Sequence, residues 1–121
     1  MTTATHTHPL VATIAEALDA GDRDALAALF APDPTYLSVG GANPPSAPLL
    51  LRGDAVREYV RGIPATIRMT LEDHIVGADG RVWVRTLCVF PEGGSAVSSH
   101  IVTLDDEGRI ATQQCVEAVD A

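Results

Sequence analysis

His100 is the side chain best suited to chemistry in this chain of 121 residues. It stands within Ser95–Leu104, a run of small, apolar and hydroxyl residues that is typical of a β-strand. In an apolar pocket the charged imidazole would be disfavoured by desolvation, which leaves a neutral ring able to act as base or donor near pH 7. Proton abstraction beside a carbonyl group is the reaction that would suit it. A hydrogen-bonded structural role is the alternative, and strand parity leaves the direction of the ring open.

Two further side chains are candidates for a catalytic role. Asp73 follows the alternating stretch 66–72, and parity points it inward, where a buried carboxylate needs a partner such as His100. A β-bulge that turns Asp73 to solvent beside Glu72 is the simpler interpretation. Ser38 carries a hydroxyl group but has no evident base beside it, so the sequence favours a spectator over a nucleophile.

The composition excludes several other chemistries. All eight basic residues are arginine, and a chain without lysine can form neither a Schiff base nor a Walker phosphate loop. No HExxH motif, clustered metal ligands or glycine-rich dinucleotide loop occurs, so no cofactor is predicted. The formal charge of −8 repels phosphate backbones and anionic lipids, which argues against nucleic-acid and membrane partners.

One domain accounts for almost the whole sequence. Residues 1–8 form a Thr-rich segment without the basic start or apolar run of a signal peptide, and no later run approaches the length of a membrane span. We therefore expect a flexible leader at 1–8 and a single domain at 9–121, in the cytoplasm. Cys88 and Cys115 are far apart in apolar runs and are expected to be reduced and buried.

Periodicity predicts helices first and strands afterwards. A first helix is expected near 8–20, a second after Asp22 with Phe30 on its apolar face, and a third from Asp54 to about 62–64. Turn signals separate the strands that follow. The strands are expected at 35–39, from 66 onward, and at 81–90, 95–104 and 109–119, with an irregular loop at 40–48. This order argues for an α+β domain whose helices pack on one face of an antiparallel sheet.

Four short motifs in a fixed order carry a family resemblance. They are ALDAGD at 17–22, AALFAPD at 27–33, LRGDAVRE at 51–58 and DEGRI at 106–110. With these motifs the chain resembles the nuclear transport factor 2-like superfamily and, within it, the SnoaL-like and ketosteroid-isomerase-like branch. The resemblance covers nearly everything after residue 8. It implies a cone-shaped α+β domain with a curved antiparallel sheet around a long helix, a deep apolar pocket and commonly a homodimer.

The residues of ketosteroid isomerases do not carry over to this sequence. The resemblance places the position of the general-base aspartate on Ser38 and that of the oxyanion-hole tyrosine on Ile14. The protonated aspartate of that hole corresponds to His100. Steroid isomerisation by the familiar mechanism is therefore not expected, and His100 is the usable group that remains.

The same resemblance suggests how the pocket is lined. Ser38, Gln113 and Tyr36 would supply hydrogen bonds to a developing oxyanion, whereas Cys115 and the apolar residues would shape the cavity. The full set of expected ligand-binding residues is Ile14, Phe30, Tyr36, Tyr59, Met69, Val102, Gln113 and Cys115.

Two functions of different classes follow from these observations. The first is a cofactor-free isomerase, cyclase or lyase that acts on a small apolar carbonyl compound with His100 as general acid/base. The second is a non-catalytic protein that binds a small hydrophobic metabolite or serves as a dimeric module, through a sheet face carrying Trp83 or Arg85. A pH–rate limb near neutrality would favour the enzyme, and ligand binding unaffected by His100→Ala would favour the binding protein.

Overall fold

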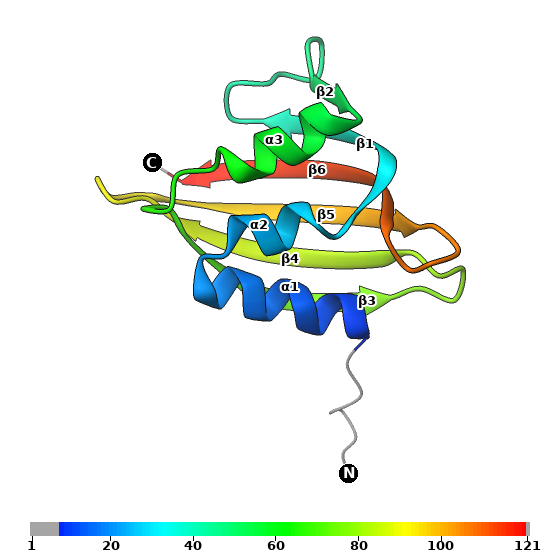
Figure 1. Ribbon diagram of the computed structural model, residues 1–121. Helices are drawn as coiled ribbons and strands as arrows, with labels where there is room; N and C mark the ends of the chain where they lie inside the picture. Colours follow the sequence, from blue (N-terminus) through cyan, green and yellow to red (C-terminus); the bar gives the residue numbers. More distant parts are fainter. Residues whose placement is uncertain (1–7, 121) are drawn as a thin grey trace.

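Three helices lie on one face of a six-stranded sheet in the computed structural model, which describes residues 8–120 (Figure 1). The helices are α1 (Pro9–Ala20), α2 (Arg23–Ala27) and α3 (Asp54–Arg61), and the strands are β1 (Phe30–Gly40), β2 (Leu49–Arg52), β3 (Arg68–Val76), β4 (Val82–Val89), β5 (Ser95–Leu104) and β6 (Ile110–Asp120). The strands follow one another across the sheet in the order β2-β1-β6-β5-β4-β3. This arrangement confirms the expected α+β cone with helices packed in a curved sheet.

Local signals in the sequence fix both ends of α1. Pro9 opens the helix, and the Nδ1 atom of His8 accepts a hydrogen bond from the Leu10 N–H at 3.1 Å. Gly21 ends the helix in the left-handed conformation, with a φ of 66°. His8 was assigned to the leader by sequence but is the N-cap of α1, whereas the rest of the predicted leader lies outside the described residues.

The region after α2 differs from its prediction. The structure ends α2 at Ala27 and starts β1 at Phe30, although helical spacing placed Phe30 on the second helix. Pro32 and Pro34 give the physical reason, because a residue that precedes a proline is disfavoured in the helical region and the chain is therefore extended. The short strand β2 (Leu49–Arg52) was also not predicted; it pairs antiparallel with β1.

The sheet is mixed and not purely antiparallel. β1 runs parallel to β6, from Phe30 opposite Ile110 to Gly40 opposite Glu117, and the other four pairings are antiparallel. The expectation of a wholly antiparallel sheet was therefore wrong at this one pairing. The antiparallel pairs all join strands that are adjacent in sequence, but β1 and β6 meet only in three dimensions, so local sequence signals do not specify their direction.

A β-bulge in β3 decides the direction of Asp73. The register between β3 and β4 shifts between Leu71 and Asp73, which makes Glu72 the extra residue. The shift breaks the alternation of inward and outward side chains, and Asp73 is exposed as a result. The interpretation of this stretch as a bulge is confirmed.

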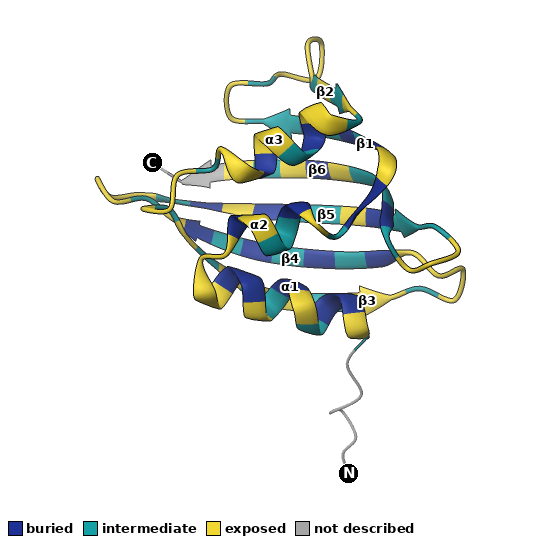
Figure 2. Cartoon of the chain, in the orientation of Figure 1, coloured by how far each residue is buried: buried dark blue, intermediate teal, exposed yellow. Residues whose placement is uncertain are grey.

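The hydrophobic core fills the space between the helices and the concave face of the sheet. Alternate residues of β4 are buried, and the buried stripe of α1 faces the sheet (Figure 2). The largest fully buried side chains are Val11, Val56, Val82, Val102 and Pro34. Because α1 packs against β3 and α3 packs against β1, the middle of the concave face is left for a cavity.

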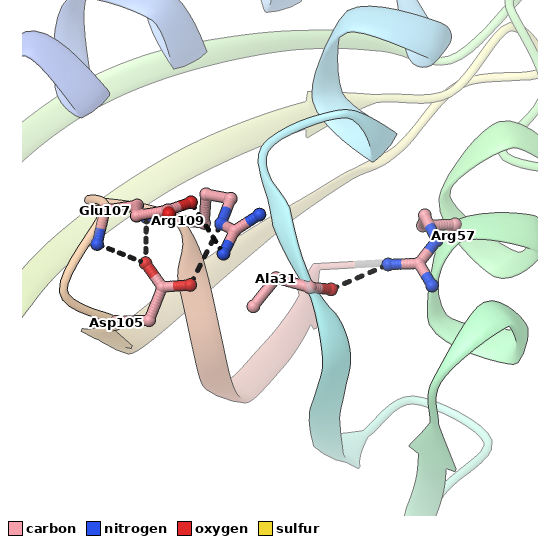
Figure 3. Close-up of polar contacts among 5 residues, drawn as sticks. All are labelled: Ala31, Arg57, Asp105, Glu107 and Arg109. Atoms are coloured by element: carbon pink, nitrogen blue, oxygen red, sulfur yellow. Dashed lines mark hydrogen bonds and ion pairs between the residues drawn. The ribbon is translucent and has the colours of Figure 1, made fainter.

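Polar contacts stabilise the turn between β5 and β6 (Figure 3). The Asp105 carboxylate accepts hydrogen bonds from the backbone N–H groups of Glu107 and Arg109 and from Arg109 Nε, each at 2.9 Å. The Arg109 backbone N–H contributes most to holding the pKa of Asp105 below its usual range. Nearby, Arg57 Nη1 donates to the Ala31 carbonyl oxygen at 2.7 Å and holds α3 over the start of β1.

Candidate functional site

An apolar cavity of about 110 Å³, which we call the inner chamber, lies between the helices and the sheet. Its wall consists of aliphatic and aromatic side chains, among them Ile14 and Phe30, together with three polar residues. The polar residues are Thr86, His100 and Gln113, contributed by β4, β5 and β6 respectively. Apart from the Tyr59 hydroxyl group on α3, the polar groups of this chamber therefore come from the sheet.

A second cavity of about 430 Å³, the outer chamber, adjoins the first. The residues common to both walls are Tyr36, Tyr59, Ile63, Met69, Thr86 and His100. The outer chamber is the more polar of the two, because Ser38, Asn43, Ser98 and Glu117 also line it. His100 therefore stands at the boundary between an apolar interior and a polar vestibule.

Strand register explains why the His100 ring points into the cone. His100 is paired with Val84 on β4 and with Cys115 on β6, both of which are buried. Its neighbours of the same parity on β5, Ser98 and Val102, are buried as well. The question that sequence parity left open is thus answered by the structure, which places His100 on the concave face.

Both ring nitrogens of His100 have side-chain partners. Nδ1 lies 3.0 Å from the Gln113 amide nitrogen, and Nε2 lies 3.4 Å from the Thr86 hydroxyl oxygen. When the Gln113 amide nitrogen donates to Nδ1, the ring proton is on Nε2; when the amide turns, its oxygen accepts from Nδ1–H and the lone pair of Nε2 is free. The orientation of the Gln113 amide therefore selects the tautomer.

Burial keeps the imidazole neutral. Desolvation lowers the pKa of His100 from 6.5 to about 4. The ring is therefore uncharged above that value, and any pH dependence that it confers moves to lower pH than the neutral limb expected from the sequence.

Two tyrosines stand at the junction of the chambers. The rings of Tyr36 and Tyr59 are tilted against each other, with centroids 5.5 Å apart. Burial, followed by the Cys115 thiol, raises the pKa of the Tyr36 phenol far above its usual range. Tyr36 therefore remains protonated and is a hydrogen-bond donor at every physiological pH.

The structure brings most of the predicted site residues together. Ile14, Phe30, Tyr36, Tyr59, Met69, His100 and Gln113 line the inner chamber, and Ser38 and Cys115 line the outer one. Val102 belongs to the core and lines neither chamber. Asp73 is exposed on β3, where its carboxylate accepts from the His74 backbone N–H at 2.8 Å, so it does not join His100.

Sequence reasoning missed four polar residues of the site, namely Asn43, Thr86, Ser98 and Glu117. Strand parity could have found Thr86, because it follows Val82 and Val84 on the same face of β4. Ser98 and Glu117 have the parity of His100 and Cys115, but that signal depends on knowing which face of each strand is concave.

Two further kinds of feature are absent from the described part of the chain. Among residues 8–120, no group of three or more His, Cys, Asp or Glu side chains is arranged to hold a metal ion. No helix in that range is long and apolar enough to cross a membrane. A cytoplasmic location stays a prediction.

Solved structures share this fold at low sequence identity. An NTF2-like protein of unknown function from Mesorhizobium loti is 21% identical and aligns over 93% of this chain and 88% of its own, with a TM-score of 0.72. The epoxide hydrolase/cyclase-like enzyme SalBIII, which acts in pyran ring formation in the polyether salinomycin, is 24% identical over 90% of this chain and 88% of its own, with a TM-score of 0.67. RV0760c from Mycobacterium tuberculosis, in complex with estradiol-17beta-hemisuccinate, is 18% identical over 88% and 90% of the two chains, with a TM-score of 0.63.

No curated protein matches the sequence closely enough to be counted as a relative. The model of the SnoaL-like domain, in contrast, matches residues 11–113, from the first turn of α1 to the start of β6. Together with the cone fold and its two chambers, this match confirms the resemblance drawn from the four motifs. The chain belongs to the SnoaL-like domain family.

Proposed function

We propose that this chain is a cofactor-free isomerase, cyclase or lyase that acts on a small, largely apolar carbonyl compound, with His100 as general acid/base. One observation carries the proposal: a neutral imidazole stands at the boundary of an apolar cavity, with both nitrogens held by side chains. Membership of the SnoaL-like family and the fold shared with a cyclase-like enzyme support a reaction of this class.

The basicity of His100 suits the abstraction of a carbon-bound proton. With a pKa of about 4 the ring is as basic as an ordinary carboxylate, and it is unprotonated at neutral pH. In the proposed step the Gln113 amide is turned so that its oxygen accepts from Nδ1–H, which frees the Nε2 lone pair. This lone pair takes a proton from the carbon beside the carbonyl group, and the electrons of that C–H bond form the enolate. The protonated ring then returns the proton to another position of the same substrate.

The developing oxyanion needs hydrogen-bond donors. Thr86 and Tyr36 carry hydroxyl groups on the wall common to both chambers, and the Tyr36 phenol remains protonated. Ser38 adds a further hydroxyl in the outer chamber. We assign these three residues to the stabilisation of the oxyanion and Gln113 to the choice of the His100 tautomer.

Proton exchange on small cyclic ketones and enones tests the proposal. In deuterated buffer, we expect the wild-type chain to accelerate exchange or isomerisation of at least one compound of the panel, as followed by NMR. His100→Gln should lower this rate by about 100-fold or more. The control His74→Gln changes a histidine that lines neither chamber and should leave the rate unchanged. Equal rates for the wild type and His100→Gln would refute the assignment of His100.

A non-catalytic binding protein is the second candidate. The wall of the inner chamber favours it, because that wall offers few groups for acid/base chemistry. Among its described lining residues, His100 is the only one that titrates near neutral pH or below. The steroid derivative bound by RV0760c shows that a protein of the same fold can hold a hydrophobic ligand. Ligand affinity that is unchanged in His100→Gln, without turnover of any compound in the panel, would establish this function instead.

We also propose that the chain forms a homodimer through the convex face of the sheet. No helix covers this face, and Ile75, Ile101 and Val116 are exposed on it by 60%, 43% and 61%. Trp83 is paired with both Ile75 and Ile101 and lies on the same face. Light scattering should give twice the monomer mass for the wild type and the monomer mass for Ile101→Glu. A wild type that is monomeric at micromolar concentration would refute the dimer.

A further inference from the structure

Among the residues that the structure describes, Glu117 is the one charged side chain in the wall of the outer chamber. It lies on β6, with Ser98 beside it on β5 and Gly40 beside it on β1. Within residues 8–120 none of the six ion pairs involves Glu117, and no arginine lines this chamber. His100 is neutral and cannot compensate the charge. A single negative charge therefore faces an otherwise uncharged cavity.

Aromatic rings surround the same space. Tyr36, Tyr59 and Phe90 line the outer chamber with Glu117. The field of the carboxylate reaches their surroundings: burial raises the pKa of the Cys88 thiol, and Glu117 raises it further. Aromatic faces next to a carboxylate form an environment that attracts an organic cation, because the ring quadrupoles and the negative charge act in the same direction.

The backbone beneath Glu117 is closely packed. Gly40 has a φ of 117°, and a Cβ atom at this position would overlap the Glu117 carbonyl oxygen. The turn that follows is closed by hydrogen bonds between Gly40 and Asn43, at 2.7 Å and 3.0 Å. Glu117 is thus held between two strands at a fixed position, and Asn43 of this turn lines the chamber with it.

We propose that the outer chamber binds the protonated or quaternary amine of a ligand, and that Glu117 makes this protein prefer a cationic ligand to a neutral one. The inference deepens the proposed function, on which it rests for the use of this cavity, and it narrows the substrate class to an apolar carbonyl compound with an ammonium group at its outer end. The apolar body occupies the inner chamber beside His100, and the ammonium group lies among Tyr59, Phe90 and Glu117.

Two probes of the same shape test this preference. Benzyltrimethylammonium is a cation, and neopentylbenzene is its neutral isostere with carbon in place of nitrogen. In NMR titrations of the full chain, we expect the wild type to bind the cation about tenfold more tightly than the isostere. Glu117→Gln should remove this preference, because it weakens the binding of the cation and leaves the affinity for the isostere unchanged. Glu16→Gln makes the same charge change at an exposed position of α1 and should keep the preference.

Several outcomes would overturn the inference. They are equal affinities of the wild type for both probes, failure of the wild type to bind the cation at millimolar concentration, and a preference that survives in Glu117→Gln. If Glu117→Gln does not fold, two other measurements replace it. Glu117→Asp keeps the charge and must retain the preference, and added salt must lower the affinity for the cation but not for the isostere. A preference for the cation without any turnover of ketones or enones would leave this inference standing and refute the proposed function.

Discussion

Arg23 and His100 are both basic side chains in the interior, but their hydrogen-bond partners and their surroundings differ. Arg23 is 8% exposed and donates to three backbone carbonyl oxygens, those of Ile63, Pro64 and Ile67, at 2.8–3.3 Å. His100 has two side-chain partners and faces both chambers. A charge surrounded by backbone acceptors fastens a segment in place, whereas a neutral ring beside a cavity is available to a ligand.

The two side chains nevertheless belong to one arrangement. Ile63, Pro64 and Ile67, whose carbonyl oxygens accept from Arg23, also line the outer chamber. Arg23 therefore shapes the wall of the vestibule without touching a ligand. The comparison predicts that changes at Arg23 act mainly on stability and that changes at His100 act mainly on chemistry.

The largest effect on stability is expected for Arg23→Met. The substitution removes the three hydrogen bonds that the guanidinium group donates to backbone carbonyl oxygens. We therefore expect the free energy of unfolding to fall by about 3 kcal/mol. Urea denaturation measures this change. The control Arg61→Met removes a half-exposed guanidinium group that pairs with Asp24 at 3.3 Å, and it should cost under about 1 kcal/mol. Equal losses in the two variants would refute the fastening role of Arg23.

An effect of similar size is expected from the pH dependence of stability. The pKa of His100 is about 4 in the folded chain and near 6.5 in the unfolded one, so between these values only the unfolded chain binds the proton. Stability from the neutral ring is complete above pH 6.5 and is lost as the pH falls from there through 4, by about 3 kcal/mol in total. Urea denaturation from pH 7 to pH 4 should show this loss in the wild type and a shallower one in His100→Gln. Parallel pH profiles would contradict the depressed pKa.

The smallest effect concerns the two partners of the His100 ring. Gln113 lies 3.0 Å from Nδ1 and Thr86 lies 3.4 Å from Nε2, so Gln113→Leu should disturb the ring more than Thr86→Val. We expect Gln113→Leu to cost about 1 kcal/mol and to change the tautomer populations that ¹⁵N NMR of the ring reports. The opposite order of the two variants would show that Thr86 is the main partner.

The order of the elements could be predicted from the sequence because the signals are local. The proline at the start of α1, the Gly21 stop and the turn glycines specify helix and hairpin ends within a few residues of themselves. The parallel pairing of β1 with β6 could not be predicted, because no local signal encodes contacts between distant segments. The strand β2 escaped prediction for a related reason: Leu49–Arg52 has only four residues, without the alternation that marks a half-buried strand.

The site was only partly predictable for the same reason. His100 was identified from its residue type and from the family resemblance, but its direction depends on its partners Val84 and Cys115 across the sheet. At Asp73 parity alone pointed inward, and the bulge that the sequence analysis preferred at Glu72 turns the side chain outward. Glu117 was missed because a carboxylate near the end of a strand is usually a solvated surface residue.

The place of β6 between β1 and β5 has a consequence for the order of folding. The β1–β2 pair and the β3–β5 meander can each form from neighbouring sequence, but they remain separate until β6 inserts between them. Contacts between segments so far apart in the chain form slowly. Gln113 and Glu117 arrive with that strand, so both chambers are completed in the closing step. A newly made chain therefore acquires its two chambers only after β6 has been synthesised, and until then the unpaired edges of β1 and β5 are open to aggregation.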